Sequence, residues 1–298
     1  MHVLSFLIQL SLYALTSSVL LSRFVPRLRY LLQYGKTLES ITPVECALRP
    51  KYSLIESACD AILKPLGFTV PKRWFTHFYV LGLSLSAASS AMLYLCHSGK
   101  LTWLLAKDVF ILKASDINVS YTRAMAAITI VTLQCFRRLY ECIFVEKMSQ
   151  TARMRGGHYI VGHLFYVAAT AATWSDALES TLARDDEGDS VPKIAIIMYL
   201  VAALAQYTTH DQLSRLKKYS LTPPTMLFKH LVCPHYTAEV VIYLALAWIC
   251  GFTQANVAVL VWTAVSLGTS AEQSRKFYVE KFGAKAVEGK WNLVPFVF

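Results

Sequence analysis

Residues Val3 to Leu21 read VLSFLIQLSLYALTSSVLL, and none of these side chains carries a charge. A helix that crosses the hydrocarbon core of a bilayer needs about 20 mostly apolar residues, so this stretch is long enough to span a membrane. Six further apolar stretches follow along the chain: Trp74–Cys96, Tyr121–Val145, Tyr159–Trp174, Ile194–Thr208, Thr237–Phe252 and Ala255–Ala271.

The composition of the whole chain agrees with these stretches. Of the 298 residues, 55% are hydrophobic and only 16% are charged, whereas about a quarter are charged in an ordinary soluble domain. The stretches are too long for barrel strands, and in lipid only helices otherwise satisfy their own backbone. We therefore predict an all-α integral membrane bundle of about seven transmembrane helices, forming a single domain over residues 1–298. The apolar segment from Leu101 to Leu112 contains Lys107 and Asp108, and is predicted to be interfacial or re-entrant.

Lysine and arginine residues divide unevenly between the loops of such a bundle. The loops and tail on one side carry 21 of them, and the loops on the other side carry 4. Because cytoplasmic loops hold the excess of positive charge, the N-terminus is predicted to be luminal and the C-terminus cytoplasmic. Positive loops beside spans also explain the net charge of +10, so no nucleic acid partner is expected.

Seven cysteines are present, and no two of them form a C-x-x-C pair. Their odd number and their placement in apolar runs favour buried free thiols over a disulfide framework or a zinc site. No metal is expected.

The third predicted span ends in the polar group Gln134, Arg137, Arg138, Tyr140 and Glu141. Ionisable residues within spans are costly and normally face the interior of the bundle. Arg138 and Glu141 are three residues apart and share a helix face, so a structural ion pair is one interpretation. The other is that the planar guanidinium of Arg138 contacts phosphate.

Three more polar groups lie at or near the ends of later spans: first Gln206, His210, Arg215, Lys217 and Lys218; then Pro234, His235, Tyr236 and Glu239; and finally Arg275, Lys276, Phe277 and Tyr278. A lone histidine such as His210 is often structural, and Lys217 and Lys218 are also explained as residues of a positive loop. As a cluster, the first group resembles a phosphate-binding rim. The Glu239 carboxylate must be paired or hydrogen-bonded in its apolar surroundings.

The familiar soluble nucleotide-binding motifs do not occur in the sequence. It has no G-x-G-x-x-G and no P-loop. It also lacks the H-E-x-x-H zinc motif and the G-x-S-x-G nucleophile elbow of hydrolases. A nucleotide would therefore have to bind within the helical bundle and its cytoplasmic loops.

Six short motifs in register along the chain resemble the steroid 5α-reductase family, and most closely its polyprenol (polyprenal) reductase branch. They are YGK at 34–36, VPKRWFTHFY at 70–79, RRLYEC at 137–142, PHYTAE at 234–239, FY at 277–278 and VPFVF at 294–298. The match runs from about Tyr34 to the last residue. Residues 120–298 would form its catalytic part.

The resemblance implies a seven-helix bundle in the endoplasmic reticulum membrane, with NADPH as cofactor. It implies reduction of the α-isoprene double bond of polyprenal or polyprenol, on the route to dolichol for protein N-glycosylation. Six positions match cofactor-side residues of the family: Tyr34, Lys36, Arg138, Lys217, His235 and Tyr278. Gln206 and His210 complete our set of cofactor-binding candidates, and Glu239 matches a carboxylate near the nicotinamide.

Three positions depart from the steroid-reducing members. Thr69 stands where they carry an acid, Cys135 where they carry a tyrosine, and Leu221 where they carry an arginine. The contacts to a steroid carbonyl are therefore missing. Tyr140 and His77 are the candidates to stabilise the enolate oxygen that forms in the reaction. A polyprenyl chain is longer than the bilayer core, so we predict a lateral apolar opening between spans.

Two alternatives remain open at this stage. The first is a steroid or trans-enoyl-CoA reductase on the same fold. The second is a non-enzymatic lipid transporter or scaffold, although no internal repeat typical of transporters is present. The expected partners are a polyprenyl substrate and membrane lipids, and the sequence does not indicate an oligomeric state.

Overall fold

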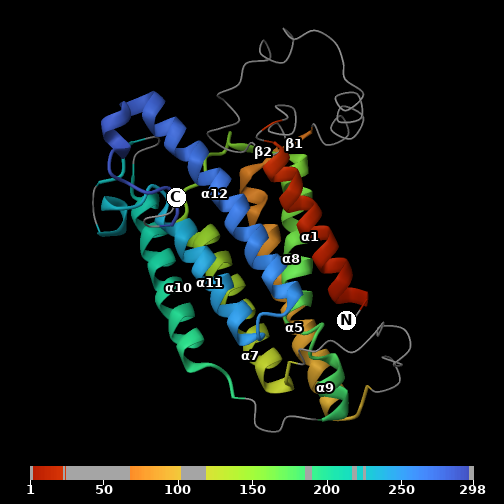
Figure 1. The fold of residues 1–298 in the computed structure, drawn as a ribbon. Coiled ribbons are helices and arrows are strands. Elements are labelled where there is room, and N and C mark those ends of the chain that lie inside the picture. The colour runs from red at the N-terminus through yellow and green to blue at the C-terminus, as the bar shows by residue number, and fades with distance from the viewer. Residues whose placement is uncertain are drawn as a thin grey trace.

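The computed structural model describes residues 3–22, 24, 68–101, 119–184, 190–216, 220–223 and 226–294. Seven long helices run side by side in the described part of the chain (Figure 1): α1 Val3–Leu21, α5 Phe75–His97, α7 Tyr121–Tyr140, α8 Gly156–Ala172, α10 Lys193–Ser214, α11 Pro234–Ile249 and α12 Gln254–Phe282. A short helix, α9 Leu178–Ala183, lies at one end of the bundle. The predicted all-α class is confirmed.

Strands β1 Thr69–Pro71 and β2 Arg153–Arg155 form the sheet seen in the described residues, at the other end of the bundle (Figure 1). They pair antiparallel, with Val70 opposite Met154. This pair fixes the entry of α5 relative to that of α8, because each strand runs almost directly into its helix. Short 3-10 turns complete the pattern at Lys72–Trp74, Met226–Lys229 and Ala284–Val287.

Local sequence accounts for several helix ends. The Ser120 hydroxyl caps α7 by accepting from the backbone N–H of Arg123 at 3.2 Å. Pro234 opens α11, where its missing N–H costs nothing. Gly283, with φ of +83°, ends α12. After Tyr140, α7 widens into the π-turn Glu141–Val145, a departure that is frequent at functional sites.

Small buried residues bring the helices together. Ala195, Ala202 and Ala203 of α10 belong to the same core cluster as Ile242 and Ala245 of the neighbouring α11. Small side chains at such positions let neighbouring helices approach closely. α1 packs along α12 and also meets α8, so it covers the side where those two helices meet.

Each of the seven predicted stretches coincides with one of the long helices. Two helical segments of the structure, Val3–Leu21 and Lys72–His97, are long and apolar enough to cross a membrane by length and hydropathy, with mean hydropathies of 1.8 and 1.5. Two helices run well beyond the predicted stretches: α10 continues to Ser214, and α12 continues to Phe282. The predicted interfacial segment ending at Leu112 lies almost entirely outside the described residues.

The five cysteines in the described part of the chain are buried thiols, as predicted, and none of them is in a disulfide. They are Cys96, Cys135, Cys142, Cys233 and Cys250.

Candidate active site

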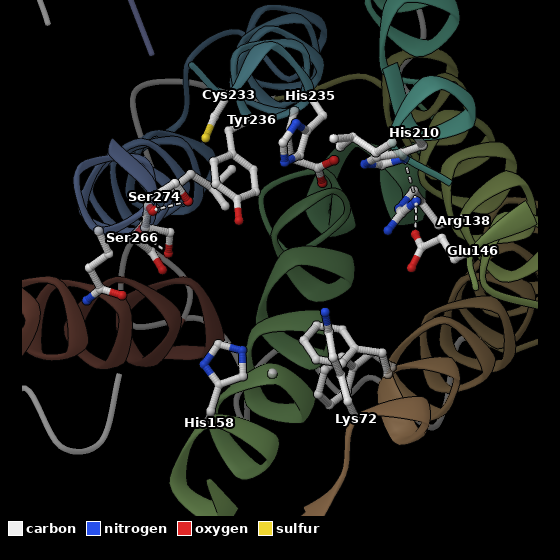
Figure 2. Close-up of a pocket in the computed structure, with 18 of the residues that line it drawn as sticks. Lys72, Arg138, Glu146, His158, His210, Cys233, His235, Tyr236, Ser266 and Ser274 are labelled. Atoms are coloured by element: carbon white, nitrogen blue, oxygen red, sulfur yellow. Dashed lines mark hydrogen bonds and ion pairs between the residues drawn. The ribbon is translucent and has the colours of Figure 1, made fainter. Parts of the chain in front are cut away.

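A cavity of about 900 Å³ opens within the bundle at the end where β1 and β2 lie. Six of the long helices each contribute several lining residues, and the seventh, α7, contributes Arg138. Figure 2 shows basic, acidic and hydroxyl side chains around this space: Arg138, Glu146 and His210 on one side, His235 and Tyr236 on the next, Ser266 and Ser274 beyond them, and Lys72 and His158 opposite.

Arg138 lies at the centre of one polar network. Its Nη1 lies 3.0 Å from Oε1 of Glu146 and 2.7 Å from Nδ1 of His210, and it also donates to Glu141. Its Nη2 donates to the Tyr79 hydroxyl at 3.1 Å. The guanidinium therefore ties α7 to α5 and α10 while one edge faces the cavity (Figure 2).

Glu141, Glu146 and His210 offer ligand atoms within 4.8 Å of one another, a spacing that could hold a metal ion. However, Nη1 of Arg138 contacts all three side chains. A guanidinium is permanently charged. The positive charge of Arg138 therefore lies where a metal cation would bind, and Glu141, Glu146, His210 and Arg138 are better described as an ion-pair cluster.

A second network leads from Arg137 to Glu239. Arg137 donates to Glu141, to the Gln206 amide oxygen and, at 2.8 Å, to the Gln134 amide oxygen. Gln134 donates in turn to Gln206 at 3.0 Å and to Oε2 of Glu239 at 3.3 Å. Because these groups are buried or half-buried, each needs such partners to offset the loss of water.

Glu239 is held by one of its two carboxylate oxygens. Gln206 and Gln134 both donate to Oε2, whereas Oε1 accepts no hydrogen bond from the residues that the structure describes. The side chain lines the cavity. Glu239 is thus fixed in place with one acceptor oxygen available to a ligand. Gln206 also donates to the backbone carbonyl of His235 at 3.3 Å, which couples the start of α11 to α10.

The start of α11 is also held by the C-terminal segment. Trp291 pairs with Leu231 in a parallel bridge, its N–H donates to the His230 carbonyl at 2.9 Å, and its carbonyl accepts from Val232 at 2.9 Å. Arg275 of α12 anchors this segment, because it donates to Asn292 at 2.6 Å and to the Val287 carbonyl at 3.1 Å. Residues far apart in the sequence therefore position His235.

Burial shifts the titration of three cavity residues that lie beyond the predicted apolar stretches. Desolvation, with a smaller contribution from Lys72, lowers the pKa of His158 to about 4. Desolvation and then the charge of Arg138 lower the pKa of His210. Desolvation raises the pKa of Tyr278 to about 12. All three side chains are therefore held in their neutral forms near neutral pH.

Six of the residues singled out in the sequence are brought together around the cavity: Arg138, Gln206, His210, His235, Glu239 and Tyr278. Tyr34, Lys36 and Lys217 lie outside the described residues.

His77 and Tyr140 do not line the cavity. His77 is exposed and its Nδ1 lies 2.8 Å from the Tyr159 hydroxyl, while Tyr140 is 45% exposed and packs against Phe144. Each stands two residues, about 200° around the helix, from a residue that does line it: Tyr79 or Arg138.

Sequence reasoning missed several cavity residues. Lys72 and Tyr79 belong to the VPKRWFTHFY motif, and the spacing Phe75, Phe78, Tyr79 marks one helix face that includes Tyr79 and excludes His77. That signal was available. His158 and Tyr166 of α8 and Tyr243 of α11 also line the cavity, and no motif distinguished them from ordinary residues of an apolar helix.

Known proteins match the chain along most of its length. Residues 159–298 match the family model for 3-oxo-5-alpha-steroid 4-dehydrogenase. The chain is 31% identical over 266 residues to the polyprenal reductase of Saccharomyces cerevisiae, an alignment that covers 89% of this chain and 85% of the relative. It is 27% identical to the polyprenal reductases of Xenopus laevis, covering 78% of each chain, and of Drosophila melanogaster, covering 76% of each. The chain therefore belongs to the steroid 5α-reductase family, in its polyprenal reductase branch.

Proposed function

We propose that this protein is an NADPH-dependent reductase of the endoplasmic reticulum membrane that saturates the α-isoprene double bond of polyprenal, in the synthesis of dolichol for protein N-glycosylation. The relatives named polyprenal reductase support the substrate class. The observation that carries the proposal is the cavity itself, in which the Arg138 cluster, His235 and the held carboxylate of Glu239 face one space.

The residues present fit a reduced nicotinamide dinucleotide. The cavity volume of about 900 Å³ is at the upper end of the range usual for ligand pockets. Lys72, Arg138 and Lys147 line it and supply positive charge for phosphate groups. The available oxygen of Glu239 can accept from the carboxamide of a nicotinamide.

When bound, the cofactor supplies the hydride that adds to the β-carbon of the enal. The protein holds the two reactants together and keeps water away. In this proposal Arg138 and Lys72 neutralise phosphate, His235 and His210 pack beside the dinucleotide as neutral rings, and Glu239 orients the nicotinamide face. Tyr278 borders the dinucleotide on the α12 side of the cavity. Tyr34, Lys36 and Lys217 remain proposed cofactor contacts by resemblance.

The structure offers little for a steroid carbonyl at the positions that depart from the steroid-reducing pattern. The Thr69 hydroxyl accepts from Nε of Arg153 at 2.7 Å within the β1–β2 pair. Cys135 is 1% exposed and does not line the cavity. Leu221 is 41% exposed. These placements favour an open-chain enal over a 3-oxo steroid.

We further propose that the isoprenoid tail leaves the cavity beside α1. Leu15 and Val19 of α1 line the cavity together with Ile160 and Phe165 of α8, and Ile160 is also 40% exposed on the outer surface. The cavity wall is therefore apolar where it approaches the surface of the bundle. A chain longer than the bilayer core needs such a lateral path.

The seven apolar stretches within the long helices are proposed as the transmembrane spans, with the cavity at their cytoplasmic end. Engineered glycosylation acceptors test this orientation. An acceptor placed in the loop between Ser175 and Pro192 should be glycosylated in microsomes, and one near Ser220 should not. The reverse pattern would overturn the orientation.

A substrate panel tests the reaction. Purified protein with NADPH should reduce polyprenal and leave a 3-oxo-4-ene steroid and a trans-enoyl-CoA nearly untouched. The family model's own description makes steroid reduction the second candidate, and steroid turnover equal to or above that of polyprenal would favour it. Failure of the protein to bind NADPH would instead favour a transporter or scaffold.

A further inference from the structure

The proposed reaction, on which this inference rests, needs a hydrogen-bond donor at the carbonyl oxygen of the enal. Hydride addition to the β-carbon moves the electrons of the double bond onto that oxygen, and a donor placed there lowers the barrier. Cys135 stands where steroid-reducing members carry a tyrosine, and its thiol is buried away from the cavity. The chain must provide the donor from another element.

We infer that Tyr79 of α5 is this donor. Its ring is only 6% exposed and lines the cavity. Gly82 lies one turn further along α5, and a Cβ at Gly82 would lie 2.6 Å from Sγ of Cys135 and 3.0 Å from the Tyr166 ring. Helices α5 and α7 therefore approach too closely for a phenol at position 135. The phenol on the same face of α5, one turn away, takes that role.

The Tyr79 hydroxyl is oriented by a cation. Its oxygen accepts from Nη2 of Arg138 at 3.1 Å, and a guanidinium can only donate. The hydrogen of Tyr79 is therefore not used in this bond, and no hydrogen bond to the described residues uses it elsewhere. The positive charge of Arg138 also stabilises the phenol oxygen as its hydrogen is shared with a developing enolate.

Aromatic contacts fix the ring itself. The Tyr166 ring meets it edge-on, with centroids 5.6 Å apart at 79°, and Cζ of Arg138 lies 5.2 Å from its centroid. Tyr166 and Tyr243 line the same wall, but their hydroxyls have no hydrogen-bond partner among the described residues. Of Tyr79, Tyr166 and Tyr243, Tyr79 is therefore the one whose hydroxyl is oriented by a hydrogen bond within the described part of the chain.

Tyr79 is not consumed when the enal is reduced. The hydride comes from NADPH, which loses one C–H bond and is oxidised to NADP⁺. This hydride forms the new C–H bond at the β-carbon while the electron pair of the double bond moves through the α-carbon to the carbonyl oxygen. Tyr79 shares its hydrogen with that oxygen. After hydride transfer, solvent that enters as the site opens gives a proton to the α-carbon, and the saturated aldehyde leaves with Tyr79 unchanged.

Tyr79→Phe removes only the hydroxyl. In the full-length protein with polyprenal and NADPH, we expect kcat to fall by about 10²–10³-fold, the usual effect of losing one donor to an oxyanion. The KM for NADPH should stay the same, because the proposed partner of the hydroxyl is the carbonyl oxygen of the enal. The matched control is Tyr94→Phe on the same helix, whose side chain is 56% exposed and whose kcat should stay within twofold of wild type.

A second measurement reads the hydrogen bond directly. Polyprenal labelled with ¹³C at the carbonyl is bound in the presence of NADP⁺, which has no hydride to give, and its carbonyl stretch is recorded by infrared difference spectroscopy. The frequency should be lowered in wild type and in Tyr94→Phe, and should return toward the value in apolar solvent in Tyr79→Phe.

The outcomes separate this inference from the proposed function. If wild type reduces polyprenal and Tyr79→Phe retains both turnover and the lowered frequency, the assignment of Tyr79 is overturned while the reductase function stands. A wild-type complex without the lowered frequency overturns it regardless of how the variant folds. If wild type reduces no polyprenal at all, the proposed function fails, and this inference falls with it.

Discussion

Gly162 of α8 lies directly against the ring of Phe78 of α5, so that a Cβ at Gly162 would lie 2.6 Å from Cζ of that ring. Phe78 is 3% exposed and lines the cavity. Gly162→Ala should therefore push the ring into the cavity and lower the free energy of unfolding by about 1–3 kcal/mol, as overpacking typically does. Thermal unfolding in detergent measures this loss.

A double-mutant cycle tests whether contact with the Phe78 ring causes the loss of stability in Gly162→Ala. Phe78→Leu removes the ring atoms that Gly162→Ala meets, so the two changes together should destabilise less than the sum of their separate effects. Strict additivity would show that the two helices are not in such close contact.

Arg138 joins a buried ion-pair cluster to the cavity, and Arg138→Ala should affect both. Loss of a charge-assisted contact costs about 1.5–3 kcal/mol, so the KM for NADPH should rise roughly tenfold or more, well above any change in the KM for polyprenal. The melting temperature should also fall, because Glu141 is fully buried and loses a cation. Steady-state kinetics and thermal unfolding measure the two effects.

Lys100→Ala is the control for Arg138→Ala. It also removes one positive charge, from an exposed residue that follows α5 at the opposite end of the bundle, and it should leave both constants unchanged. An Arg138→Ala protein that loses stability but keeps its NADPH dependence would reduce Arg138 to a structural residue.

Protonation of His158 should destabilise the protein in mild acid. Its folded pKa of about 4 lies below the ordinary value of 6.5, because burial and Lys72 disfavour the charged ring. The unfolded chain therefore takes up this proton at a higher pH than the folded chain. The stability that His158 contributes is present above about pH 6.5 and is lost as the pH falls toward 4.

His158→Gln removes this titration. Urea unfolding at pH 7 and pH 5 should show a smaller loss of stability at pH 5 in the variant than in wild type. All other groups, His210 among them, are the same in both proteins, so the difference between the two reports His158. Equal losses would mean that the ring is solvated in the folded state.

Arg275 should contribute to stability through the C-terminal segment that positions His235. Arg275→Met removes donors to Asn292 and Val287 and should cost about 1.5–3 kcal/mol, with weaker NADPH binding measured by fluorescence titration. Its neighbour Lys276 forms an exposed i, i+4 pair with Glu272, so Lys276→Met should change stability by less than about 1 kcal/mol. Equal effects of the two changes would argue against the anchoring role.

The sequence by itself determined which segments become helices and where charge gathers. Apolar runs such as Val3–Leu21 were predicted to be helical because, in the proposed membrane, their backbone must be satisfied internally, and this requirement is local. The motifs also identified Arg138, His235 and Glu239 as residues that share a site, since their order and spacing match a known family. The extent of α10 and α12 beyond the apolar runs was not evident, because polar residues continue a helix without a hydropathy signal.

Only the tertiary structure decided which face of each helix meets the cavity. Tyr140 and His77 belong to the right motifs, but they point away from the space that Arg138 and Tyr79 face. A helix turns about 100° per residue, so residues two apart are directed to nearly opposite sides, and the neighbouring helices determine which side is the interior. The close approach of α5 to α7 at Gly82 and Cys135, and the bond from Arg138 to Tyr79 that accompanies it, depend on contacts between residues more than fifty positions apart, and no local pattern in the sequence encodes them.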